Sequence, residues 1–75
     1  MANDDGPEDL LTTATRHVRE GEERVARQEA RLAALIRNGH HDAAARGAKV
    51  LEQMRLSLDL ARRHLEFELR KQAQK

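Results

Sequence analysis

Two seven-residue repeats of small and apolar side chains, separated by one Asn-Gly pair, constrain this 75-residue chain more than any other feature. In each repeat these residues recur at alternating spacings of three and four, which places them along one side of an α-helix. Strand-forming residues are scarce, and Ala, Leu, Arg and Glu dominate the composition, as in long helices and coiled coils. The sequence therefore predicts an all-α fold.

The first repeat predicts a helix over about residues 7–38, preceded by a disordered acidic tail at 1–6. Pro7 and the carboxylates after it suit a first helical turn, and Gly39 suits a stop because glycine adopts the left-handed conformation easily. Outside the repeat, glutamates stand four residues before arginines, the favourable orientation for ion pairs: Glu20 with Arg24, and Glu23 with Arg27. The repeat holds Leu11, Val18, Val25 and Leu32 at position a, and Ala14, Gly21, Gln28 and Leu35 at position d.

The second repeat predicts a helix over about residues 42–72, after a turn at 39–41. Asp42 can cap this helix. A connection this short makes the two helices antiparallel neighbours, so residues 7–75 are expected to form one coiled-coil-like hairpin. The repeat holds Ala44, Leu51, Leu58 and Leu65 at a, and Gly47, Met54, Ala61 and Glu68 at d.

Residue sizes across the hairpin predict its register. When residues whose numbers add up to 79 are paired, large side chains face small ones in nearly every layer, for example Leu32 with Gly47 and Leu58 with Gly21. Each glycine would cost about 1 kcal/mol in a helix interior if it had no packing role. Gly21 and Gly47 are therefore predicted to be positions of close helix–helix approach.

The four histidines are weak candidates for metal binding. His40 and His41 are neighbours in the turn, with neither a Cys nor a third His nearby to complete a tetrahedral site. His17 and His64 both fall at position g, on the same edge of the seam, with Glu20 and Glu68 one turn away. A site with two histidines and two carboxylates is conceivable there, but the ligand count favours no metal and no cofactor.

Other functional classes find little support in the sequence. No nucleophile stands beside an activating base, and there is no glycine-rich phosphate loop, so we expect no enzymatic activity. Eleven arginines could contact nucleic acid, but they alternate with Glu and lack aromatic partners for stacking bases. No segment resembles a secretory signal or a membrane span, so we expect a soluble cytoplasmic protein without membrane contact.

The second helix carries more apolar residues than its seam uses. Positions c and f, which point away from the first helix, hold Leu56, Leu60 and Phe67, and Leu69, Ile36 and Val50 extend the apolar surface along the flanks. A 75-residue chain with a thin two-helix seam has little core of its own. The sequence therefore predicts a homodimer packed as a four-helix bundle, or docking on a helix of another protein, through Leu56, Leu60, Phe67 and Leu69.

The stretches "HVREGEERVARQEARLAALIRNGHHDAA" and "LEQMRLSLDLARRHLEFEL" resemble a group of short, uncharacterised alphaproteobacterial proteins. The shared features are a His-Val-x-x-Gly-Glu-x-x-Val-x-x-Gln run, a Gly-His-Asp type of turn and a Leu-rich second helix, over about residues 16–69. The chain departs from that pattern by its second turn histidine, His41. The resemblance implies a helical hairpin and no particular activity.

Overall fold

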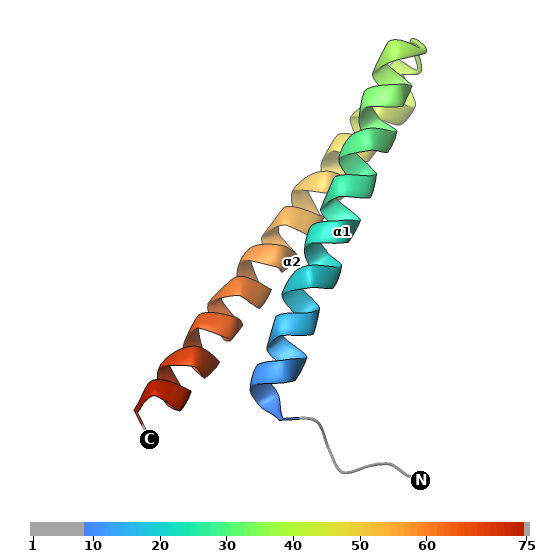
Figure 1. The fold of residues 1–75 in the computed structure, drawn as a ribbon. Coiled ribbons are helices and arrows are strands. Elements are labelled where there is room, and N and C mark those ends of the chain that lie inside the picture. Colours follow the sequence, from blue (N-terminus) through green and yellow to red (C-terminus); the bar gives the residue numbers. More distant parts are fainter. Residues whose placement is uncertain (1–8, 75) are drawn as a thin grey trace, which may run out of the picture.

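A computed structural model describes residues 9–74 of the chain. The described residues form two α-helices, α1 (Leu10–Arg37) and α2 (His41–Ala73), which lie side by side and run in opposite directions (Figure 1). The molecule measures 53 × 32 × 13 Å. Its smallest dimension is about the diameter of one helix with its side chains. Within residues 9–74 no third element covers either broad face of the hairpin.

Asp9 begins α1 as its N-cap. The backbone of Asp9 is extended, and its carboxylate accepts a 2.7 Å hydrogen bond from the backbone N–H of Thr12 and a 3.2 Å bond from the Thr12 hydroxyl. The bond from the backbone N–H, and to a smaller extent the bond from the hydroxyl, lower the pKa of the Asp9 carboxyl below its ordinary value. Helix α1 begins at Leu10, a little after the start predicted at about residue 7; Pro7 and the predicted tail at 1–6 fall outside the described residues.

A Schellman motif ends α1 at Arg37, with Gly39 in the left-handed conformation at φ 76°. The N–H of His40 donates to the Leu35 carbonyl at 2.9 Å, and that of Gly39 donates to the Ile36 carbonyl at 3.1 Å. The predicted glycine stop is thus confirmed.

The predicted cap of α2 at Asp42 was wrong. The turn is complete at His40, which is the N-cap of α2 and makes no side-chain capping bond. Asp42 instead lies in the first turn of the helix, where its carboxylate still complements the helix dipole.

The core lies along the seam between the helices and is thin. Within residues 9–74 its buried apolar side chains are Ala14, Ala44, Leu51 and Leu58. A Cβ atom added to Gly21 would lie 3.1 Å from Cδ1 of Leu58, and one added to Gly47 would lie 3.6 Å from Cδ1 of Leu32. Both glycines thus face the leucines with which the residue-size argument pairs them.

The absence of a side chain at Gly47 also leaves its backbone carbonyl oxygen accessible to a side chain of α1. The side-chain amide of Gln28 donates a 3.0 Å hydrogen bond to that oxygen. A part-buried polar group at position d of α1 is thereby satisfied within the seam.

The helices are also joined by ion pairs along one edge, formed by the e positions of both. Arg55 bonds Glu29 at 2.7 Å, and Arg62 bonds Glu22 at 3.2 Å. Both pairs have residue numbers that add up to 84, as a constant antiparallel register requires. We call this edge the e edge, and the opposite edge, formed by the g positions, the g edge.

The ion pairs expected within α1 do not form. Among the described residues no ion pair joins Glu20 to Arg24 or Glu23 to Arg27. All of these side chains are exposed, and pairs of this kind contribute only about 0.2–0.5 kcal/mol, too little to hold flexible side chains together against solvation. Neither helix contains a stretch apolar enough to span a bilayer.

Candidate functional site

The main surface feature of α2 is a set of large apolar side chains that face solvent. Their exposed fractions are 54% for Leu56, 63% for Leu60, 53% for Phe67 and 50% for Leu69. We call these four residues the α2 stripe. Of the large aliphatic and aromatic side chains of α2, only Leu51 and Leu58 are buried. Helix α2 therefore exposes more such side chains than it buries.

Heptad positions divide the α2 stripe between the two edges of the hairpin. Leu60 and Phe67 are at position c, next to the g edge, and Leu56 lies at f on the outer side of the helix. Leu69 is at position e, the row that holds Arg55 and Arg62 of the interhelical ion pairs. Val50, at 45% exposed, adds apolar surface on the g edge.

A groove runs between the two helices along the g edge, with a volume of about 530 Å³. Its α2 wall is mainly apolar and includes Val50, Met54, Leu58 and Ala61, with Gln53 and Ser57 among them. Since Leu60 and Phe67 follow Gln53 at intervals of seven residues, the α2 stripe continues the line of this wall. Gly21 forms part of the floor, where the helices approach closely.

The α1 wall of the groove is basic. His17 and Arg24 line the groove, and an adjoining hollow is lined by Arg24, Arg27, Arg31, Gln28 and Met54. Arg24, Arg27 and Arg31 stand on successive turns of α1, and no carboxylate of the described residues lies within 4.0 Å of their guanidinium groups. No carboxylate lines either hollow. The g edge thus combines an apolar wall with unpaired positive charge.

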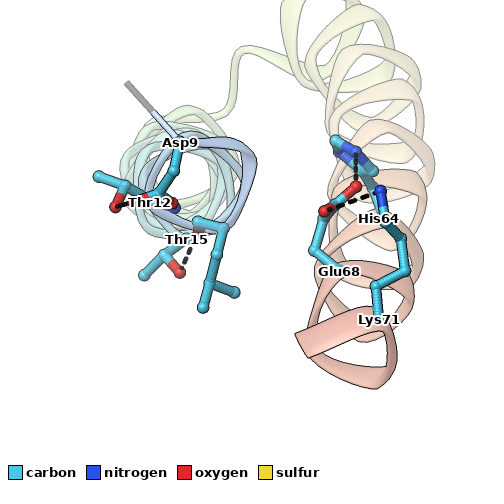
Figure 2. Close-up of polar contacts among 7 residues, drawn as sticks. Asp9, Thr12, Thr15, His64, Glu68 and Lys71 are labelled. Carbon is cyan, nitrogen blue, oxygen red and sulfur yellow. Dashed lines mark hydrogen bonds and ion pairs between the residues drawn. The ribbon is translucent and has the colours of Figure 1, made fainter. Parts of the chain in front are cut away.

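A buried carboxylate lies near the open end of the hairpin. Glu68 is 3% exposed and projects from α2 between the half-exposed side chains of His64 and Lys71 (Figure 2). Its oxygens lie 3.4 Å from Nε2 of His64 and 3.6 Å from Nζ of Lys71. The ammonium group of Lys71 also lies 5.4 Å from the ring centre of Phe67. Burial of a charge is costly unless it is paired, so these two neighbours account for its tolerance in the seam.

The histidines considered as metal ligands are separated into different surroundings. His17 lines the groove, while His64 pairs with Glu68. Residues 9–74 contain no group of three or more His, Cys, Asp or Glu side chains arranged to hold a metal ion. His40 serves as the N-cap of α2, and His41 is the first residue of that helix.

The hydroxyl groups near the start of α1 serve the helix itself. Thr15 donates a 2.9 Å hydrogen bond to the Leu11 carbonyl, and Thr12 donates to Asp9 (Figure 2). Ser57 lies on the α2 wall of the groove beside apolar side chains. None of these three hydroxyls has a histidine or lysine as a hydrogen-bond partner within residues 9–74, as an activated nucleophile would require.

Sequence reasoning missed two features of this surface. It assigned Arg24 and Arg27 to ion pairs within α1, so it did not anticipate their place in a basic wall. It also placed Glu68 at a seam position without predicting its pairing with Lys71. A signal was available in both cases, because the g positions of α1 read His17, Arg24 and Arg31, and Lys71 follows Glu68 by three residues.

No protein-family model, curated protein or solved structure matches this chain.

Proposed function

We propose that this chain is a small, non-catalytic helical module that binds another protein chain through the α2 stripe. The observation that carries the proposal is that all four residues of the stripe are at least half exposed, while the seam buries few apolar side chains. Scattered apolar residues on a surface need no explanation, but a helix that exposes more large apolar side chains than it buries lacks a partner for that face. Covering it would add the apolar burial that a chain of this size needs.

Two kinds of partner fit the stripe. A second copy would give a homodimer packed as a four-helix bundle with the α2 helices in the centre, and a helix of another protein would dock in the manner of helix-in-groove complexes. Both arrangements bury Leu60 and Phe67. The proposal describes a module that regulates or assembles by contact and does no chemistry of its own.

Sedimentation equilibrium at tens of micromolar tests the homodimer, with Leu60→Glu, Phe67→Glu as the disrupting double variant. The matched control is Leu10→Glu, Ala30→Glu, which changes two exposed apolar residues of α1 that lie outside the α2 stripe and its flanks. For a homodimer, the wild type and the control sediment at twice the monomer mass, and the disrupting variant sediments as a monomer. A monomeric wild type whose melting temperature is unchanged by the disrupting change would contradict a structural role for the stripe.

If the wild type is monomeric, the same variants test docking on another protein. In a pull-down from cell extract the disrupting variant should lose a partner that the wild type and the control retain. Equal capture by all three proteins would count against the stripe as the contact surface.

A second candidate is association with nucleic acid, and the observation in its favour is the row of Arg24, Arg27 and Arg31 without acidic partners. Guanidinium groups contact phosphates well, and such binding weakens steeply as salt rises. Anisotropy of a labelled oligonucleotide at low and at physiological salt tests it. No binding at low salt would remove this candidate.

A further inference from the structure

We propose that the groove on the g edge binds an amphipathic helix of another protein whose flank carries carboxylates, and that it does not bind a second copy of this chain. The inference rests on the proposed interaction function and names the partner of that surface. The bound helix places its apolar side chains against α2 and its acidic side chains against α1.

The α2 wall supplies the apolar side of the groove. Val50, Met54 and Ala61 line one side of the groove at helical spacing, and Leu60 continues that side outward. The wall from Val50 to Ala61 extends over about 17 Å, because each helical residue rises about 1.5 Å. A partner helix of three or more turns, with apolar residues at intervals of three and four, matches this length.

The two edges of the hairpin differ in whether their arginines are paired with carboxylates. On the e edge, Arg55 and Arg62 are neutralised by glutamates of α1. On the g edge, Arg24 lines the groove, Arg27 and Arg31 line the hollow that adjoins it, and the lining of neither contains a carboxylate. A partner that brings carboxylates to this wall would form charge-assisted bonds there. Complementary charge of this kind also selects among partners and raises the association rate.

The same charges disfavour a second copy in the groove. A copy that inserted its own α2 stripe would bring the neighbouring f positions with it. These positions hold Lys49, Arg63 and Arg70, whereas the acidic b positions of α2, Glu52, Asp59 and Glu66, lie about 100° from Leu60 around the helix. Cations would then approach the arginines of α1.

A nucleic acid would satisfy the arginines but not the rest of the groove. It would leave Val50, Met54 and Leu58 against a charged backbone, and the imidazole of His17 is the one aromatic ring among the residues that line the groove. A helix with one apolar and one acidic side matches both walls at once.

Fluorescence anisotropy of the full chain with two labelled 21-residue helical peptides tests the inference. Both peptides carry the same leucine face, and the flanking positions are Glu in one and Lys in the other. We expect the Glu peptide to bind at least about 10-fold more tightly than the Lys peptide, a factor that corresponds to about 1.4 kcal/mol. The double variant Arg24→Glu, Arg31→Glu should reverse this preference.

The matched control is Arg19→Glu, Arg37→Glu, which changes the net charge equally at two exposed arginines of α1 that do not line the groove. It should keep the preference of the wild type. Circular dichroism confirms that each variant is helical before binding is compared.

These experiments separate a failure of the charge-selective groove from a failure of the proposed interaction function. Equal binding of the two peptides, or equal effects of the two double variants, would overturn the charge-selective groove and leave an interaction module standing. A mixed-sequence 20-nucleotide DNA that displaces the Glu peptide at physiological salt and lower concentration would overturn it in favour of a polyanion. A wild type that binds neither peptide and remains a monomer would overturn this inference. If the wild type, the disrupting variant and the control also capture the same extract proteins, the proposed function is defeated as well.

Discussion

The two seam glycines should respond differently to the same substitution, because their surroundings differ by a few tenths of an ångström. Glycine in a helix interior is less favourable than alanine by about 1 kcal/mol. At Gly47 the new methyl group would lie 3.5 Å from Nε2 of Gln28 and 3.6 Å from Cδ1 of Leu32, which are ordinary van der Waals distances. Gly47→Ala should therefore stabilise the hairpin by most of that amount.

At Gly21 the new methyl group would lie 3.1 Å from Cδ1 of Leu58, and 3.8 and 3.9 Å from its Cβ and Cα. Leu58 is buried, so its Cδ1 atom must move by a few tenths of an ångström within the seam. A side chain forced about 30° from its preferred rotamer costs about 0.5–1.5 kcal/mol, which offsets the gain in helix propensity. Gly21→Ala should therefore be near neutral, and less stable than Gly47→Ala by about 1 kcal/mol.

Leucine in place of either seam glycine should destabilise the hairpin. Gly21→Leu would drive a side chain toward the backbone of Leu58 and should cost about 1–3 kcal/mol or more. Gly47→Leu would overpack the seam against Leu32 and displace the Gln28 amide from its carbonyl partner, with a cost of similar size.

Urea and thermal unfolding followed by circular dichroism measure all four variants. For a domain of this size about 1 kcal/mol corresponds to roughly 4–8 °C in melting temperature, so the two alanine variants should be separated clearly. Equal stabilisation by Gly21→Ala and Gly47→Ala would refute the close approach at Gly21. Unchanged melting in Gly47→Leu would refute the register itself.

The remaining predictions concern the buried carboxylate, the helix cap and the metal question. Glu68→Leu should raise the urea midpoint, because an apolar residue removes the cost of burying a carboxylate while His64 and Lys71 are half-exposed and can be solvated; a lower midpoint would show that the contacts of Glu68 outweigh that cost. Asp9→Ala should lower the melting temperature at pH 7, and because the pKa of Asp9 is lowered by folding, the difference from wild type should shrink as the pH falls below about 3.9. A difference that persists at pH 2 would contradict the role of the ionised cap. Zinc or iron(II) should leave the melting temperature unchanged, and a stoichiometric rise that is lost in His17→Ala or His64→Ala would contradict this prediction.

The amino-acid sequence by itself determined the two helices, the turn and the layers of the seam. The heptad spacing of leucine, valine and alanine is a local property, and so is the preference of Gly39 for the left-handed conformation. Register followed from residue size, since Gly21 and Gly47 each leave room for a leucine on the other helix. These features depend on neighbours along the chain or on volume, and both can be evaluated from residue types.

The structure was needed to locate the two N-caps, and only tertiary packing decided the use of the charges. Asp9 and Asp42 both stand near the start of a predicted helix, but α2 already begins at His41, so that Asp9 is the N-cap of α1 whereas Asp42 lies inside the first turn of α2. Arginines occur in the rows of both edges, yet the sequence cannot say which of them meet a carboxylate. That depends on the residue that faces each one across the seam: Arg55 meets Glu29, whereas Arg24 lies across a groove from an apolar wall and keeps its charge unpaired.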